Sequence, residues 1–196
     1  MLSQDQSYSK SDQIYINLHD LRKSHSWKSQ SASIEDQIKE IFYTSSSVDA
    51  FASNDEKEKF YYKYLGIYAK NYPQYFVIAV RKTGAEPAEV LGYICGTDQT
   101  CSDHINLNPY YREFIGKVPD FPAHLHINCA QGSRGMGLGS KLLQSFEHLV
   151  SEKCSGIHLI TTPESKNVSF YKKNGYNHAF KKSFKNHSLL MLAKKF

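Results

Sequence analysis

One stretch of the sequence decides the fold: Gln131 to Leu143, which reads QGSRGMGLGSKLL. It follows a strand-like run over 123–129 and opens a helix-like run over 140–152. A glycine-rich turn between a strand and a helix leaves backbone N–H groups uncovered and directs them, with the helix dipole, at one point. Glycine permits the positive φ angles of such turns and the close approach of a ligand. The stretch therefore predicts a site for a phosphorylated ligand.

The spacing of the glycines excludes two common phosphate-binding loops. They fall at positions 132, 135, 137 and 139, which does not fit the dinucleotide fingerprint G-x-G-x-x-G. Lys141 follows Ser140 rather than a glycine, so the P-loop pattern is missing as well. The alternative to a ligand site is an ordinary turn that begins a helix.

The remaining pattern, Arg134-x-x-Gly137-x-Gly139, resembles the Q/R-x-x-G-x-G/A loop of the GNAT acyltransferases. In that superfamily the amides of this loop hold the pyrophosphate of acetyl-CoA. The resemblance therefore implies acetyl-CoA as the co-substrate. The loop residues that it implies for cofactor binding are Arg134, Gly135, Met136, Gly137, Leu138, Gly139 and Ser140.

A second motif downstream supports the same resemblance. Residues 168–176 read VSFYKKNGY, similar to the superfamily's short helix that ends in F/L-Y-x-K-x-G-F/Y. Gly175 suits the position after a helix C-terminus, and Tyr176 would begin the next strand. The run PAHLHI at 122–127 further resembles one bacterial branch of the superfamily. The resemblance covers the C-terminal half of the chain well and the N-terminal half in outline.

One position departs from the superfamily pattern. An Asn usually stands seven residues before the motif tyrosine and contacts the pantetheine arm, whereas this chain has Glu164 there. Asn167, one turn later, is our candidate for that contact. The resemblance also implies that the strand before the glycine loop runs along the arm. Ile127, Asn128 and Cys129 are therefore further candidates for cofactor binding.

Tyr171 occupies the motif tyrosine, which in many relatives points at the CoA sulfur. Transfer from a thioester to an amine needs two proton movements, because an ammonium must lose a proton before attack and the leaving thiolate must gain one. We therefore expect Tyr171 to be the catalytic acid. The alternative is a core aromatic residue beside Phe170.

The strand at 123–129 supplies the candidate base. Alternation places His124, His126 and Asn128 on one face and the apolar residues between them on the other. His126 lies nearer the expected thioester, and a histidine that titrates near neutrality can relay a proton. A structural histidine bonded to a carbonyl is the alternative. We expect no metal site, because the H-x-H pair lacks an evident third ligand.

Two helices are expected in the N-terminal half. Ser33 would cap the first, and Asn54 or Asp55 would cap the second, which runs to about Asn71. Tyr64 and Tyr68 belong to an aromatic stripe on the second helix, which indicates either core packing or one wall of an acceptor pocket. In the superfamily these helices border the acceptor.

The acceptor pocket would combine several of these features. We expect Tyr64, Tyr68 and His124 to bind the acceptor, together with residues of the long segment 97–122, which reads as a functional loop. Aromatic and polar walls suit a cationic amine. The sequence does not identify the amine, which can be a small molecule, a peptide N-terminus or a protein lysine.

Composition limits the other possibilities. The chain has 196 residues and a formal charge of +5, which favours an anionic partner such as CoA. Its lysines are dispersed, so no nucleic-acid partner is expected. The four cysteines form no C-x-x-C pair, and neither a signal peptide nor a run long enough to cross a membrane is evident. We therefore expect a cytoplasmic protein, monomeric or homodimeric, without a membrane partner.

The resemblance implies an α/β fold with a mixed, mostly antiparallel sheet, splayed parallel central strands and helices on both faces. We expect one domain over 1–196, with 1–11 disordered, and an enzyme that moves an acetyl group from acetyl-CoA to a primary amine. The alternatives are a catalytically inactive CoA-binding regulatory module and a basic nucleic-acid-binding protein. Further strands are expected at 14–18, 76–80, 90–96, 156–162 and 187–193, with a hairpin loop around Gly84 and Pro87.

Overall fold

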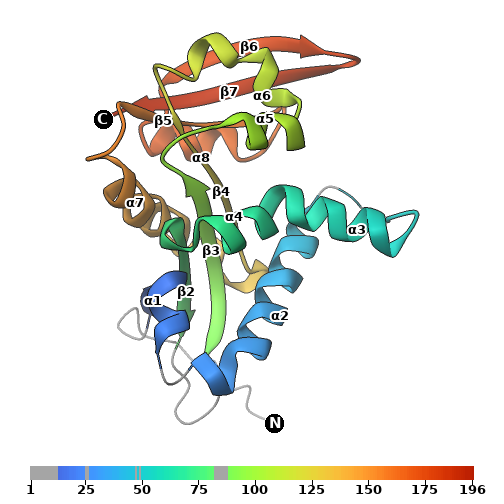
Figure 1. The fold of residues 1–196 in the computed structure, drawn as a ribbon. Coiled ribbons are helices and arrows are strands. Elements are labelled where there is room, and N and C mark those ends of the chain that lie inside the picture. Colours follow the sequence, from blue (N-terminus) through green and yellow to red (C-terminus); the bar gives the residue numbers. More distant parts are fainter. Residues whose placement is uncertain (1–12, 25–26, 47, 49, 82–87) are drawn as a thin grey trace, which may run out of the picture.

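The computed structural model describes residues 13–24, 27–46, 48, 50–81 and 88–196 (Figure 1). The expected disorder of 1–11 and the hairpin loop around Gly84 and Pro87 lie outside the described residues. The described chain forms a seven-stranded sheet in the order β1-β2-β3-β4-β5-β7-β6. Its strands are β1 (Gln13–Asn17), β2 (Phe76–Arg81), β3 (Glu89–Thr97), β4 (Ala123–Cys129), β5 (Gly156–Thr161), β6 (His178–Phe184) and β7 (His187–Lys195).

Among the strands of the described residues, only β4 and β5 run parallel, and they separate after a short contact. They pair at Ala123 with Ile157 and at His124 with His158, whereas β4 stays paired with β3 as far as Cys129. Within the described residues, the edge of β4 that faces β5 is therefore without a strand partner beyond His124. This confirms the expected mixed sheet with splayed central strands.

Helices cover both faces of the sheet, as expected (Figure 1). On one face, α7 (Leu138–Val150) buries Leu142 and Phe146 in a cluster that also contains Leu91 of β3. The short helix α8 (Val168–Lys173) packs beside it and contributes Tyr171 to the same cluster. The other face is covered by α1 (Leu18–Lys23), α2 (Trp27–Ser45), α3 (Asn54–Tyr61), the π-helical turn η2 (Tyr62–Gly66) and α4 (Ile67–Asn71). The turn η3 (Pro73–Tyr75) follows α4 and buries Tyr75 in the cluster on the α7 side.

The starts of the two N-terminal helices differ from the sequence prediction. Ser33 lies inside α2, where its hydroxyl accepts a hydrogen bond from the Gln37 amide at 3.3 Å and does not cap the helix. Ser53 caps α3, because its hydroxyl accepts from the Glu56 N–H at 3.2 Å. Asn54 is already the first helical residue. The predicted capping residues were therefore wrong for both helices, although the helices themselves exist.

The segment 97–122 is largely helical, so the prediction of a long loop was wrong. It contains α5 (Ser102–Leu107), α6 (Tyr110–Glu113) and the turn η4 (Ile115–Lys117). Phe114 and Phe121 are buried in a third cluster with residues of β7. These apolar contacts stabilise helices that are too short to produce a periodic sequence pattern.

Within the described ranges, no helix is both long and apolar enough to cross a bilayer. A cytoplasmic location and a monomeric or homodimeric state stay predictions.

Candidate active site

The glycine-rich turn lies between β4 and α7, as expected. After the turn η5 (Gln131–Ser133), Gly135 and Gly137 both have φ of 79°, a left-handed backbone that favours glycine. Gly137 is the N-cap of α7, and its oxygen accepts the N–H of Lys141 at 3.2 Å. No side chain caps this end. The first N–H groups of α7 therefore lack partners in the helix and remain available to a ligand.

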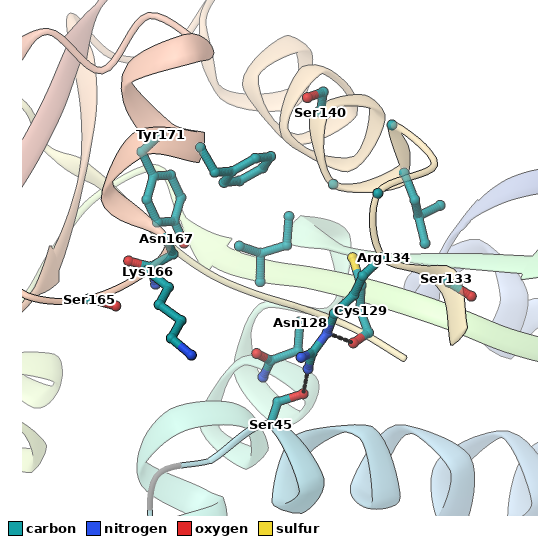
Figure 2. Close-up of a pocket in the computed structure, with 16 residues that line it drawn as sticks. Ser45, Asn128, Cys129, Ser133, Arg134, Ser140, Ser165, Lys166, Asn167 and Tyr171 are labelled. Atoms are coloured by element: carbon teal, nitrogen blue, oxygen red, sulfur yellow. Dashed lines mark hydrogen bonds between the residues drawn. The ribbon is translucent and has the colours of Figure 1, made fainter. Parts of the chain in front are cut away.

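A cavity of about 580 Å³ begins at this turn and extends to α8 (Figure 2). It is the place where the separation of β4 from β5 leaves room beside the sheet. Its lining residues are Ser45, Ile127, Asn128, Cys129, Ser133, Arg134, Gly135, Gly137, Leu138, Gly139, Ser140, Ser165, Lys166, Asn167, Phe170 and Tyr171. Every residue expected to bind the cofactor belongs to this set except Met136, whose side chain is 37% exposed outside it.

Arg134 spans one side of the cavity. Its Nε donates to the carbonyl of Cys129 at 3.3 Å, and its Nη2 donates to the hydroxyl of Ser45 at 3.2 Å (Figure 2). These bonds hold a guanidinium beside the uncovered amides of the turn. A second cation, Lys166, extends from the opposite side of the cavity (Figure 2). Two cations on opposite sides and a helix N-terminus together make the cavity attractive to anions.

The glycine at position 139 is favoured by packing rather than by φ. A Cβ there would lie 3.0 Å from the ring of Phe170 on α8, so glycine lets α7 begin against that helix. Asn167 is the N-cap residue of α8, and its Oδ1 accepts from the Thr161 hydroxyl at 3.4 Å. Its side chain lines the cavity between Tyr171 and Lys166.

Tyr171 belongs to both the core and the cavity. Its ring packs against Phe170 with centroids 5.1 Å apart, and the residue is only 5% exposed. Figure 2 shows the ring reaching from α8 towards the cavity. Burial raises the pKa of its hydroxyl well above the usual range, so the group keeps its proton at neutral pH.

The polar side chains of β4 point away from the core cluster that contains Tyr171, as strand alternation predicts. Asn128 donates from Nδ2 to the Tyr93 hydroxyl at 2.8 Å and contacts His126 Nε2 at 3.1 Å. This arrangement assigns the proton of neutral His126 to Nδ1. Burial lowers the pKa of His126 to about 4, so the expectation that it titrates near neutrality was wrong. Desolvation by the surrounding aromatic rings disfavours the imidazolium.

A second, smaller cavity of about 60 Å³ lies on this polar side of β4. It shares the strand with the first cavity, because Asn128 lines the first and the neighbouring His126 lines the second. The two are bridged by the contact between those side chains. The lining residues are Lys63, Tyr64, Tyr68, His104, Leu107, Asn108, Tyr111, Leu125, His126 and Ile160.

His124 lies behind the wall of the second cavity instead of lining it, which corrects its expected direct role. Thr100 donates its hydroxyl hydrogen to the Pro122 carbonyl at 3.0 Å and lies 2.6 Å from His124 Nδ1. His124 Nδ1–H therefore donates to Thr100, and its Nε2 accepts from the Tyr68 hydroxyl at 2.7 Å. Burial lowers the pKa of His124 well below the usual range, which keeps the ring neutral. His124 thus orients Tyr68.

Several lining residues were missed by the sequence analysis. Ser45 comes from the end of α2, Lys166 from the β5–α8 connection and His104 from α5, so no local motif unites them. Lys63 lies between two tyrosines of the aromatic stripe, which was the only sequence signal near it. Among the described residues, no group of three or more His, Cys, Asp or Glu side chains could hold a metal ion.

The strand, glycine turn, helix and separated parallel strands are the arrangement of an acyltransferase fold. Residues 73–178 match the family described as "Acetyltransferase (GNAT) domain", which is more than half of the chain. The protein belongs to the GNAT acetyltransferase family. No sequence among the curated proteins compared matches the chain.

Solved structures share the fold at low sequence identity. SsHAT is 16% identical with a TM-score of 0.66, over 94% of this chain and 98% of that one. The NatC complex bound to Gag peptide and CoA is 16% identical with a TM-score of 0.57, over 94% and 99%. A GCN5-related N-acetyltransferase from Kribbella flavida is 13% identical with a TM-score of 0.57, over 96% and 100%.

Proposed function

We propose that this protein transfers the acetyl group of acetyl-CoA to a primary amine. One observation carries the proposal: a single cavity begins at the uncovered N–H groups of the α7 N-terminus and ends at the hydroxyl-bearing ring of Tyr171. A phosphate-binding end and a proton-donating end are what a CoA thioester requires. The NatC structure, whose fold is similar, contains CoA.

The donor would lie along the edge of β4. Its pyrophosphate would accept hydrogen bonds from the N–H groups around Gly137 and Gly139, with Arg134 beside it. Its pantetheine arm would take the place of the missing strand neighbour beyond His124 and pair with the backbone of β4. Ile127, Asn128, Cys129 and Asn167 line this part of the cavity and are the proposed contacts.

Two proton movements complete the transfer. The amine nitrogen attacks the thioester carbon, the C–S bond breaks and the thiolate leaves. Tyr171 donates its proton to that sulfur, which suits a hydroxyl that burial keeps protonated. A backbone N–H of β4 would stabilise the oxyanion. Most of the remaining acceleration would come from holding amine and thioester together.

His126 is the proposed acceptor of the amine proton. It lies between the two cavities and is neutral at physiological pH, so its Nε2 lone pair is available when Asn128 gives way. A pKa of about 4 makes it a weak base. We therefore propose that the amine enters largely deprotonated. His126 then accepts a proton from the amine nitrogen only during the attack. Tyr64 and Tyr68 would line the acceptor.

A coupled binding and transfer assay tests the proposal. Acetyl-CoA is titrated into the protein by calorimetry, and the protein is then incubated with acetyl-CoA and a library of small primary amines while free CoA thiol is recorded. We expect saturable binding and amine-dependent thiol release. Binding without release for any amine would favour the inactive CoA-binding module, and the absence of binding would contradict the proposal.

A further inference from the structure

The second cavity contains a cation without an ionic partner. Lys63 is half-buried, with its Nζ 4.7 Å from the ring centroid of Tyr64 and 5.6 Å from that of Tyr110. Across the described ranges, no carboxylate lies within ion-pairing distance of this ammonium, and no acidic residue lines the cavity. Burial lowers the pKa of Lys63, because desolvation disfavours its charged ammonium.

The other polar groups of the cavity are neutral. Burial lowers the pKa of both His104 and His126, and it raises the pKa of the Tyr68 and Tyr111 hydroxyls. The acidic residue nearest in sequence, Asp103, raises the pKa of His104 only as the smaller effect and is itself exposed. The cavity therefore carries a net positive charge from Lys63.

His104 adds an unused hydrogen-bond donor. The backbone N–H of Cys101 donates to its Nδ1 at 3.2 Å, so the proton of the neutral ring is on Nε2. This buried Nε2 has no partner among the described residues. An N–H donor and an ammonium in one cavity both favour an oxygen-bearing, negatively charged ligand group.

We propose that the acceptor is a small primary amine that also carries an anionic oxygen group, and that Lys63 binds this group. The inference rests on the proposed acetyl transfer and names its substrate class. The amine end would lie towards His126 and the thioester, while the anionic end would neutralise Lys63 and accept from His104. A diamine or polyamine would instead bring a second cation to Lys63. The volume of about 60 Å³ favours a small molecule.

Matched amines test the charge preference with acetyl-CoA as donor. The probes are 4-aminobutyrate, 3-aminopropylphosphonate, butylamine and 1,4-diaminobutane, with thiol release as the measurement. We expect the two anionic probes to exceed the diamine in kcat/KM by about tenfold or more, which corresponds to about 1.4 kcal/mol. The faster of the two anionic probes identifies a carboxylate or a phosphate-like group.

Variants of two lysines separate the site from the general charge of the protein. Lys63→Met should remove the preference, and Lys63→Glu should turn it towards the diamine. Lys70→Glu is the matched control, because Lys70 is exposed on α4 and does not line the cavity. It should leave the preference unchanged.

Four outcomes would overturn the inference. A preference of the parent for the diamine, or a preference that Lys63→Glu leaves intact, would contradict the substrate class while the acetyl transfer stands. If Lys70→Glu loses the preference as fully as the Lys63 variants do, the preference comes from the general charge of the protein and not from Lys63. If the protein binds acetyl-CoA yet acetylates none of the probes or library amines, the proposed function itself fails, and the inference fails with it.

Discussion

The hydroxyl of Tyr171 distinguishes a catalytic residue from a packing residue, because the ring serves the core in either case. In Tyr171→Phe the ring remains against Phe170, so the fold should persist. We expect the single-turnover acetylation rate to fall by up to about 10²–10⁴-fold, the usual range for general acid catalysis. Affinity for acetyl-CoA should hardly change, because the bond strengthens in the transition state. Quenched-flow acetylation and calorimetry measure the two quantities.

Tyr176→Phe is the matched control for this measurement. Tyr176 is fully buried with its ring centroid 5.7 Å from that of Tyr171, and it does not line the cavity. Its variant should retain the parent's single-turnover rate. An unchanged rate in Tyr171→Phe would make Tyr171 a packing residue and leave the proposed site without an acid.

The low pKa of His126 determines the pH dependence that we expect for transfer. Because burial lowers its pKa to about 4, the ring is already neutral throughout the range from pH 6 to pH 9. The value of kcat/KM should therefore rise with pH until the amine's own pKa is reached, with no inflection near 6.5. Between two amines, the profile should shift along the pH axis by the difference between their pKa values. An inflection near 6.5 that is common to all amines and absent in His126→Gln would contradict the assigned ionisation.

At the scale of single elements, the turn before α7 is the phosphate-binding candidate. Gly137→Asn introduces a side chain that tolerates the left-handed backbone, whereas most residues would add strain there. The ideal Cβ at this position meets no atom within 4 Å and projects into open space. We expect the variant to fold and to bind acetyl-CoA at least about tenfold more weakly, or about 1.4 kcal/mol.

Gly132→Asn provides the control for the turn. Gly132 is exposed in η5, has open space around its Cβ position and does not line the cavity. The affinity of the Gly132→Asn variant for acetyl-CoA, measured by calorimetry, should equal that of the parent. Parent-like binding by Gly137→Asn would mean that the pyrophosphate lies elsewhere.

Elements with local signals were predictable from the sequence. The glycine spacing and the alternation on β4 are set by neighbouring residues, so strand, turn and helix follow from 123–150 alone. The helices within 97–122 were not predictable, because Phe114 and Phe121 stabilise them through contacts with β7. The cap at Ser53 was missed because Asn54 and Asp55 have equal cap propensity. Tertiary packing decided the first case and local capping bonds the second.

At the scale of the whole molecule, the second cavity was only partly predictable. Tyr64 and Tyr68 were candidates because they belong to an aromatic stripe on a helix that borders the acceptor in the superfamily. Lys63, His104 and Tyr111 instead meet there through the folding of η2, α5 and α6 around β4. The low pKa of His126 is likewise a property of its surroundings rather than of its residue type. Sequence spacing alone does not contain these long-range contacts.

The buried histidines should also make the stability of the whole protein depend on pH. His124 and His158 are fully buried, and burial lowers both pKa values, that of His158 to about 4. Below the unfolded value of about 6.5 the unfolded chain binds more protons, so the free energy of unfolding should fall as pH decreases towards 4. The limiting slope is about 1.4 kcal/mol per pH unit for each such histidine.

Urea unfolding between pH 7.5 and pH 5 measures this dependence. His187→Asn is a suitable control for variants of the buried histidines, because His187 is exposed at the start of β7. The control should keep the parent's slope. A free energy of unfolding that stays constant or increases over this range would show that the histidines do not remain neutral in the folded protein.

A crystal structure of the protein with CoA tests the central claim most directly. We predict that the pyrophosphate accepts hydrogen bonds from backbone N–H groups between Gly135 and Ser140, with Arg134 beside it. The pantetheine arm should run along β4 beyond His124, and the CoA sulfur should lie within hydrogen-bonding reach of the Tyr171 hydroxyl. CoA bound outside the cavity of about 580 Å³, or bound there with its sulfur away from Tyr171, would contradict the account.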